Sequence, residues 1–169
     1  MTDSGKQLPA EGRFEGRVAF QQGLREAMSA LAQGEHRDVW FSDHDFAQWP
    51  LGERAVVESF NRWALGNHHG RCVLLGAHFD AFARVHPRWV EWRQLWSHRV
   101  LCLQAPDDAV ADVPSALLVP GLVSVELFDR DHCRGLISRD PLRWTELKER
   151  IDVISQRSSE TFPPTTIGL

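Results

Sequence analysis

The sequence lacks several patterns, and each absence argues against a class of protein. No apolar run approaches the roughly 20 residues that a membrane-spanning helix needs. Residues 1–12 are polar and lack the apolar segment of a secretory signal. The three cysteines are an odd number and do not have the spacing of a metal or redox site. We therefore predict a cytoplasmic protein without a membrane span.

Motifs that mark common enzyme classes are also missing. The chain contains no GxxxxGK[ST] phosphate loop, no GxGxxG after a strand, no GxSxG elbow and no HExxH zinc motif. These absences argue against the enzyme families built on those motifs. We accordingly predict no bound cofactor.

The chain has no excess of positive charge. Its net charge is -4 and its pI is about 6.0, so no overall field attracts nucleic acid. The basic residues are nearly all arginine, which leaves a local basic patch open. Tyrosine is absent, whereas tryptophan occurs seven times. The unusual part of the composition is therefore aromatic.

What the sequence does contain is organised around one central segment. Apolar runs of strand length at 71–77 and 99–104 flank a stretch long enough to return across a sheet. This pattern predicts a strand–helix–strand unit with parallel strands. We expect one α/β domain at 13–160, with a disordered N-terminus at 1–12 and an extended C-terminal tail at 161–169.

Hydrophobic periodicity predicts the remaining elements. Helices are expected at 14–33, at 53–65, and in segments that begin at Pro87 and Pro141. Strands are expected at 38–42, 71–77, 99–104, 116–119, 123–128 and 133–138. The last three strands follow one another closely, which favours antiparallel pairing. The sequence therefore predicts a mixed sheet of about six strands with helices packed on both faces.

Three tryptophans share one face of the helix that begins at Pro87. Trp89, Trp92 and Trp96 stand at positions i, i+3 and i+7. Such a face either packs on the sheet or forms a stacking surface or subunit contact. We expect a homodimer through this face or through the apolar residues of the tail at 161–169.

Polar residues follow the first two predicted parallel strands. Asp43 and His44 end the first, and His78 and Asp80 follow the second. The carboxyl ends of such strands are where open α/β sheets bind ligands. The cluster could act as an acid/base pair, could hold a metal through Asp43, His44 and His78, or could simply form turns. We predict a binding site of six residues without a metal: Asp43, His44, His78, Asp80, Arg93 and His98.

The segment 132–140 has the sequence His-Cys-Arg-Gly-Leu-Ile-Ser-Arg-Asp. With the strand order and the final helix, it resembles one half of a phospholipase-D-like domain. That superfamily carries His-x-Lys followed, after four residues, by Asp. The resemblance implies three catalytic residues: a nucleophile at His132, a phosphate-holding residue at Arg134, and Asp140 as the counterpart of the motif's aspartate. The motif departs from the family's pattern, because arginine replaces lysine and Asp140 lies one position late.

The chain as a whole also resembles a family of small bacterial proteins without an assigned reaction. The altered motif favours loss of catalysis, while arginine retains the ability to hold a phosphate. We therefore expect a non-catalytic homodimeric module that binds a phosphate-bearing ligand, nucleic acid or protein partner. The alternative is a phosphodiester hydrolase in which His132 attacks, Arg134 clamps the phosphate, and His78 or His98 assists. On the residues alone, 129–134 is also typical of a polar hairpin turn.

Overall fold

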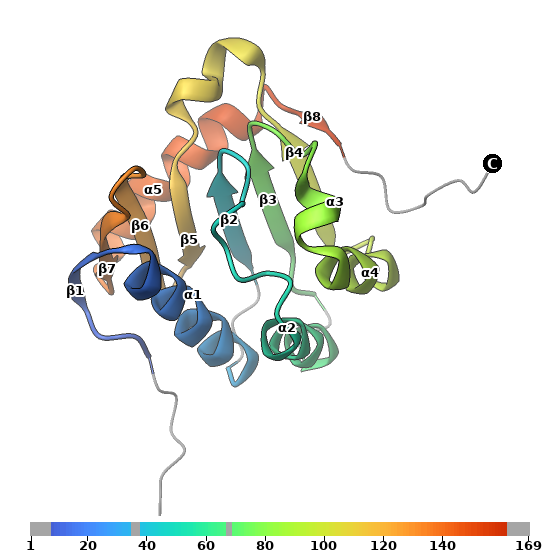
Figure 1. Cartoon of the computed structure of the whole chain (residues 1–169), viewed down its shortest axis with the longest axis horizontal. Helices are drawn as coiled ribbons and strands as arrows, with labels where there is room; N and C mark the ends of the chain where they lie inside the picture. Colours follow the sequence, from blue (N-terminus) through green and yellow to red (C-terminus); the bar gives the residue numbers. More distant parts are fainter. Residues whose placement is uncertain (1–7, 35–37, 67–68, 162–169) are drawn as a thin grey trace, which may run out of the picture.

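The computed structural model of the chain describes residues 8–34, 38–66 and 69–161. Within them, one mixed sheet has the strand order β1-β7-β6-β5-β2-β3-β4-β8 (Figure 1). The strands are β1 (Gly12–Glu15), β2 (Val39–Asp43), β3 (Cys72–Gly76), β4 (Val100–Gln104), β5 (Ser115–Val119), β6 (Val123–Asp129), β7 (Arg134–Ser138) and β8 (Ser159–Glu160). The helices are α1 (Arg17–Ala32), α2 (Arg54–Gly66), α3 (Phe82–Val85), α4 (Pro87–Leu95), α5 (Pro141–Ser155) and the 3-10 helix η1 (Asp107–Asp112). The predicted α/β class with a mixed sheet is confirmed.

The centre of the sheet is parallel. β2 pairs with β3, and β3 with β4, in parallel registers that start at Val39↔Cys72 and Cys72↔Val100. α2 connects the first two of these strands, and α3 with α4 connects the last two. The predicted strand–helix–strand unit is therefore confirmed. Its strands are almost entirely apolar, and β3 is covered on both faces, whereas Leu101 and Gln104 of β4 are exposed.

The remaining strands extend the sheet on the other side of β2. β5 is antiparallel to β2, and β6 and β7 follow by antiparallel pairing. The short connections predicted this arrangement. The α5 helix begins where the Asp-Pro signal indicates, because the Asp140 carboxylate accepts a hydrogen bond from the Leu142 N–H at 3.0 Å.

Both edges of the sheet differ from prediction. The described sheet has eight strands instead of about six, because β1 and β8 are four and two residues long and carry little apolar pattern. The N-terminal segment was also expected to be disordered through residue 12. Instead, the Pro9 carbonyl and the Glu11 carboxylate accept hydrogen bonds from Arg139, and Gly12 begins β1. Residues 1–7 and 162–169, and with the latter the expected tail contact, lie outside the described residues.

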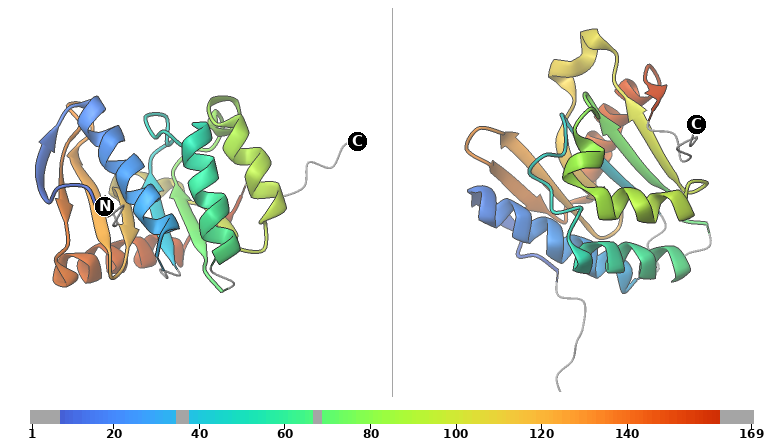
Figure 2. Two further views of the ribbon diagram at one scale, coloured as in Figure 1. Left: turned by 90° about the horizontal axis from the view of Figure 1, so that it is seen from below. Right: turned by 45° about the vertical axis from the view of Figure 1, so that its right-hand side comes forward.

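Helices cover both faces of the sheet. Figure 2 shows α1, α2 and α4 on one face and α5 on the other. Trp89 and Trp92 of α4 are buried in the chain's own core, at 0% and 5% exposure, and only Trp96 is half-buried. The packing interpretation of the tryptophan face is thus confirmed. Two of its three rings are covered within the chain, so the expected dimer contact through this face could use only Trp96.

No helix in the described part of the chain has the length and apolar character needed to cross a membrane.

Candidate functional site

The carboxyl ends of the parallel strands bring the two predicted polar clusters together. The His44 carbonyl, just beyond β2, accepts hydrogen bonds from the backbone N–H groups of Ala77 and His78, at 2.9 and 2.8 Å. Because β5 is antiparallel to β2, it starts at this same edge, and β6 ends there. We call this border of the sheet the carboxyl edge. It joins residues from four strands that are far apart in sequence.

Asp43 organises the turn that follows β2. Its buried carboxylate accepts the Phe46 N–H at 2.8 Å through Oδ2 and the Ser115 hydroxyl at 2.5 Å through Oδ1. Phe46 has a φ of 59°, a left-handed conformation that costs a non-glycine residue free energy. The Asp43 carboxylate stabilises this turn and ties it to the start of β5. The sequence left three roles open for this cluster: an acid/base pair, a metal site or turn formation. The contacts of Asp43 are those of a turn.

Arg130 lies beside this pair and was not predicted as a site residue. Its Nε donates to the Ser115 hydroxyl oxygen, and its Nη2 donates to the Val113 carbonyl at 2.7 Å. Partial burial lowers the pKa of Arg130, while the nearby carboxylates of Asp43 and Asp45 oppose this shift. The guanidinium is therefore held in one orientation at the carboxyl edge. A lone arginine in a loop after a strand gives no sequence signal for this placement.

His44 is the half-buried histidine of the cluster. Burial lowers the pKa of its imidazole, and the positive charge of Arg130 lowers it further, against the raising effect of Asp43. The neutral imidazole is therefore favoured at neutral pH, where it has both a donor and an acceptor nitrogen.

Two hollows meet at Arg130. A groove of about 1020 Å³ lies between η1, the end of β6 and α5, and a smaller hollow of about 370 Å³ lies toward α1 and the turn after β2. Both are lined by His44, Leu127 and Arg130. A groove of this size is large enough for a small-molecule ligand. The side chains at the junction would contact a ligand in either hollow.

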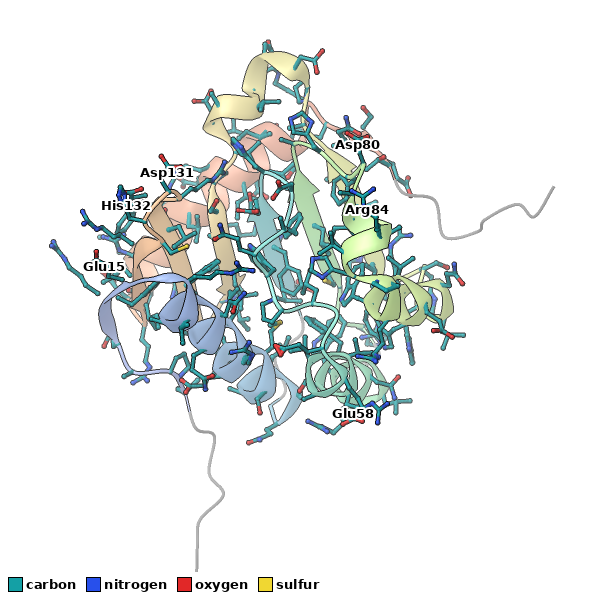
Figure 3. All side chains as sticks on the ribbon, viewed as in Figure 1. Glu15, Glu58, Asp80, Arg84, Asp131 and His132 are labelled. Carbon is teal, nitrogen blue, oxygen red and sulfur yellow. The ribbon has the colours of Figure 1, made fainter. Side chains whose placement is uncertain are left out.

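The three residues of the expected catalytic motif do not meet. His132 is an exposed residue of the β6–β7 turn, and its Nδ1 lies 2.9 Å from Oδ2 of Asp129 (Figure 3). The Arg134 guanidinium is paired with Glu15 at 3.1 Å. Asp140 follows the far end of β7, where it caps α5. The hydrogen bonds and ion pair described for His132 involve Asp129, and neither Arg134 nor Asp140 takes part in them.

The predicted binding residues are also dispersed. Asp43 and His44 line the hollows described above, while His78 and Asp80 are exposed beyond β3. Arg93 is buried on α4 beside Cys102, whose pKa burial raises to about 11 while Arg93 counteracts the shift. His98 precedes β4 and so lies at the end of the sheet opposite the carboxyl edge. The sequence analysis therefore identified Asp43 and His44 as site residues, and the structure adds Ser115 and Arg130.

The histidines and carboxylates do not form a metal site in the described residues. No group of three or more His, Cys, Asp or Glu side chains there is placed to hold a metal ion. Asp43, His44 and His78 share the carboxyl edge, but the Asp43 carboxylate is occupied by the turn and by Ser115.

The chain matches no protein-family model, and no curated protein matches it significantly. The chemistry of the site is therefore inferred from its geometry: a fixed, partly buried guanidinium and a neutral imidazole at the meeting point of two hollows.

Proposed function

We propose that this chain is a non-catalytic module of phospholipase-D-like architecture that binds a phosphate-bearing ligand at Arg130. One observation carries the proposal: Arg130 stands where the two hollows meet, and Ser115 and Val113 fix its orientation. The hydrogen bonds to Ser115 and Val113 use Nε and Nη2 of Arg130, and Nη1 takes part in neither of these two bonds. A planar guanidinium held in this way presents its remaining N–H groups to an oxyanion without further loss of side-chain entropy.

The charges around Arg130 favour a single phosphate group over a strand of nucleic acid. Asp112 and Asp131 line the two hollows, and the whole chain has a net charge of -4. Successive phosphates of a nucleic acid would meet these carboxylates and be repelled. The carboxylates of Asp43 and Asp45 are less of an obstacle, because each accepts a backbone N–H group. We therefore propose a small ligand with one phosphate at the junction.

The absence of catalysis in this proposal follows from the placement of the motif residues. A phosphoenzyme mechanism needs a nucleophilic histidine within reach of a phosphate clamp and an acid. His132 contacts Asp129, Arg134 contacts Glu15, and Asp140 caps a helix at the other end of β7. The Ser115 hydroxyl is buried against Asp43 and Arg130, so its role is to hold these two charges together.

Phosphate binding is tested by titrating the full chain with inorganic phosphate and pyrophosphate and following backbone amide shifts by NMR. We expect saturable shifts near residues 44 and 113–115, with a dissociation constant on the order of 1 mM for so small a ligand. Arg130→Gln should weaken binding at least about tenfold, because it removes the charge that the anion contacts. Arg54→Gln, an exposed arginine outside the hollows, serves as the matched control and should bind normally. Equal binding by Arg130→Gln and the wild type would refute the proposal.

The hydrolase alternative is tested with bis(p-nitrophenyl) phosphate. We expect no turnover above background. His132→Ala should change the free energy of unfolding by no more than about 0.5 kcal/mol, because its side chain is 62% exposed. Turnover by the wild type that disappears in this stable variant would establish the hydrolase and overturn the non-catalytic assignment.

A further inference from the structure

The strand β1 forms one edge of the sheet. It pairs with β7 on its inner side, and no strand among the described residues pairs with its outer side. Figures 1 and 2 show it as the outermost strand of the sheet, with α1 lying over the sheet face and not along the strand's outer side. An exposed edge of this kind offers its outward N–H and C=O groups to another strand.

The register determines which residues of β1 offer those groups. Phe14 pairs with Gly135, and the Gly16 N–H donates to the Cys133 carbonyl at 3.1 Å. In an antiparallel pair the residues that bond the neighbouring strand alternate along the chain. Even-numbered positions of β1 therefore direct their backbone groups toward β7. Arg13 and Glu15 direct theirs outward.

The side chains of this edge carry opposite charges two residues apart. Arg13 and Glu15 are exposed on one side of β1, while the Phe14 ring turns to the other side and stacks at 6.0 Å on Phe20. Glu15 also contacts Arg134 at 3.1 Å, where both side chains are more than half exposed. Val18, three residues beyond the end of β1 and 78% exposed, adds apolar surface beside the edge.

We propose that β1 pairs with β1 of a second copy of this chain, antiparallel and about a two-fold axis at Phe14. In that register Arg13 lies opposite Glu15 of the partner subunit, and Glu15 opposite the partner's Arg13. These are the positions whose backbone groups face outward, so each pair would exchange both of its backbone hydrogen bonds. Each pair would also place opposite charges across the interface. The contact would form whether or not Arg130 binds an anion.

The pattern fits a second copy because the edge is complementary to itself only in this alignment. A parallel, in-register alignment would set Arg13 against Arg13 and Glu15 against Glu15, and like charges directly opposite each other are unfavourable. The strand is only four residues long. Such a contact buries less surface than a standard protein interface, so we expect a dissociation constant on the order of 10 to 100 μM.

Charge reversal tests the interface. Sedimentation velocity of the full chain between about 5 and 300 μM should span the monomer–dimer transition. R13E and E15R should each weaken the dimer at least about tenfold, because each puts like charges opposite one another in both pairs. Mixed in equal amounts, the two variants should form a heterodimer at least about as tight as the wild-type dimer, since one edge is then wholly acidic and the other wholly basic. R54E makes the same charge change at an exposed site away from β1 and should dimerise normally.

Two results would overturn the inference. One is a wild-type chain that stays monomeric up to the highest concentration. The other is a dimer that R13E and E15R leave intact, which would place the contact elsewhere. E15R also removes the contact with Arg134, so its melting temperature is compared with that of R13E to show that both variants remain folded.

Discussion

The two faces of the sheet are built from different chemistry. The face under α1, α2 and α4 is packed with aromatic rings whose centroids lie 5.1 to 6.4 Å apart, among them Phe41, Trp49, Phe60, Trp63 and Trp92. The face under α5 buries a smaller, aliphatic cluster that includes Leu147, Ile151 and Ile154. It also holds a buried carboxylate, Glu126, which is paired with Arg150 at 2.8 Å and Arg143 at 3.6 Å.

The two faces therefore differ in what they contribute: the first mainly to stability, and the second to ligand binding. Large rings in edge-to-face contact fill the first face and leave little room for a ligand. On the second face, one helix covers the sheet incompletely and charged side chains reach the surface, so the large groove opens there. The candidate site lies at the border, where Arg130 and His44 belong to both hollows. We expect substitutions on the first face to affect folding most strongly.

The largest effect is expected from Trp89→Ala. This ring is fully buried, and its centroid lies 5.4 and 5.8 Å from the ring centroids of Phe82 and Trp92. Its removal should lower the free energy of unfolding by about 3–5 kcal/mol, the usual cost of deleting a large core side chain. Urea denaturation measures the loss. Leu95→Ala, at a 75% exposed position of the same helix, should cost no more than about 0.5 kcal/mol. Similar losses in both would mean that α4 does not pack as described.

A smaller effect is expected on the second face from Glu126→Gln. The substitution keeps the shape of the side chain and removes the charge that Arg143 and Arg150 contact. Because both arginines also reach solvent, they are not left buried without a partner. The loss should therefore be about 1–2 kcal/mol by urea denaturation. Glu146→Gln, exposed on α5, is the control and should be close to neutral. A loss as large as that of Trp89→Ala would contradict the contrast between the faces.

The smallest effect is a pH dependence that originates on the first face. His86 is buried, and its Nε2 lies 2.8 Å from the Phe46 carbonyl. Burial lowers its pKa in the folded chain, so folding favours the neutral imidazole. This contribution is complete above the unfolded-state pKa of about 6.5 and is lost as the pH falls through the lower, folded-state pKa. Urea midpoints from pH 7.5 to 5 should fall less in His86→Gln than in the wild type. An identical decline would assign the pH dependence to other groups, such as His44.

The sequence predicted those elements whose pattern is local. The apolar runs of β3 and β4, the Asp-Pro start of α5 and the helical spacing of Trp89, Trp92 and Trp96 each depend on neighbouring residues. β1 and β8 were missed because short polar edge strands carry little periodic signal. They become strands only because β7 and β4 offer backbone partners.

The candidate site was predictable only in part, for the same reason. The sequence pointed to Asp43 and His44, because residues after a parallel strand share one edge of the sheet. Ser115 and Arg130 reach the same edge through antiparallel pairing of strands that lie some seventy residues later, and no local pattern encodes that. The His132 motif was a match in local sequence only, because His132, Arg134 and Asp140 do not come together in the structure.

By itself, the sequence determined the α/β class, the parallel centre and the helices that cover it. Burial of one face of a helix or strand requires apolar residues at regular spacing, and this spacing can be read from the sequence. The tertiary structure alone decided that Asp43, Ser115 and Arg130 meet, that His132 lies apart from Asp140, and that Arg13 and Glu15 direct their backbone groups away from β7. Those relations depend on strand order and register, which are set by the packing of the whole sheet.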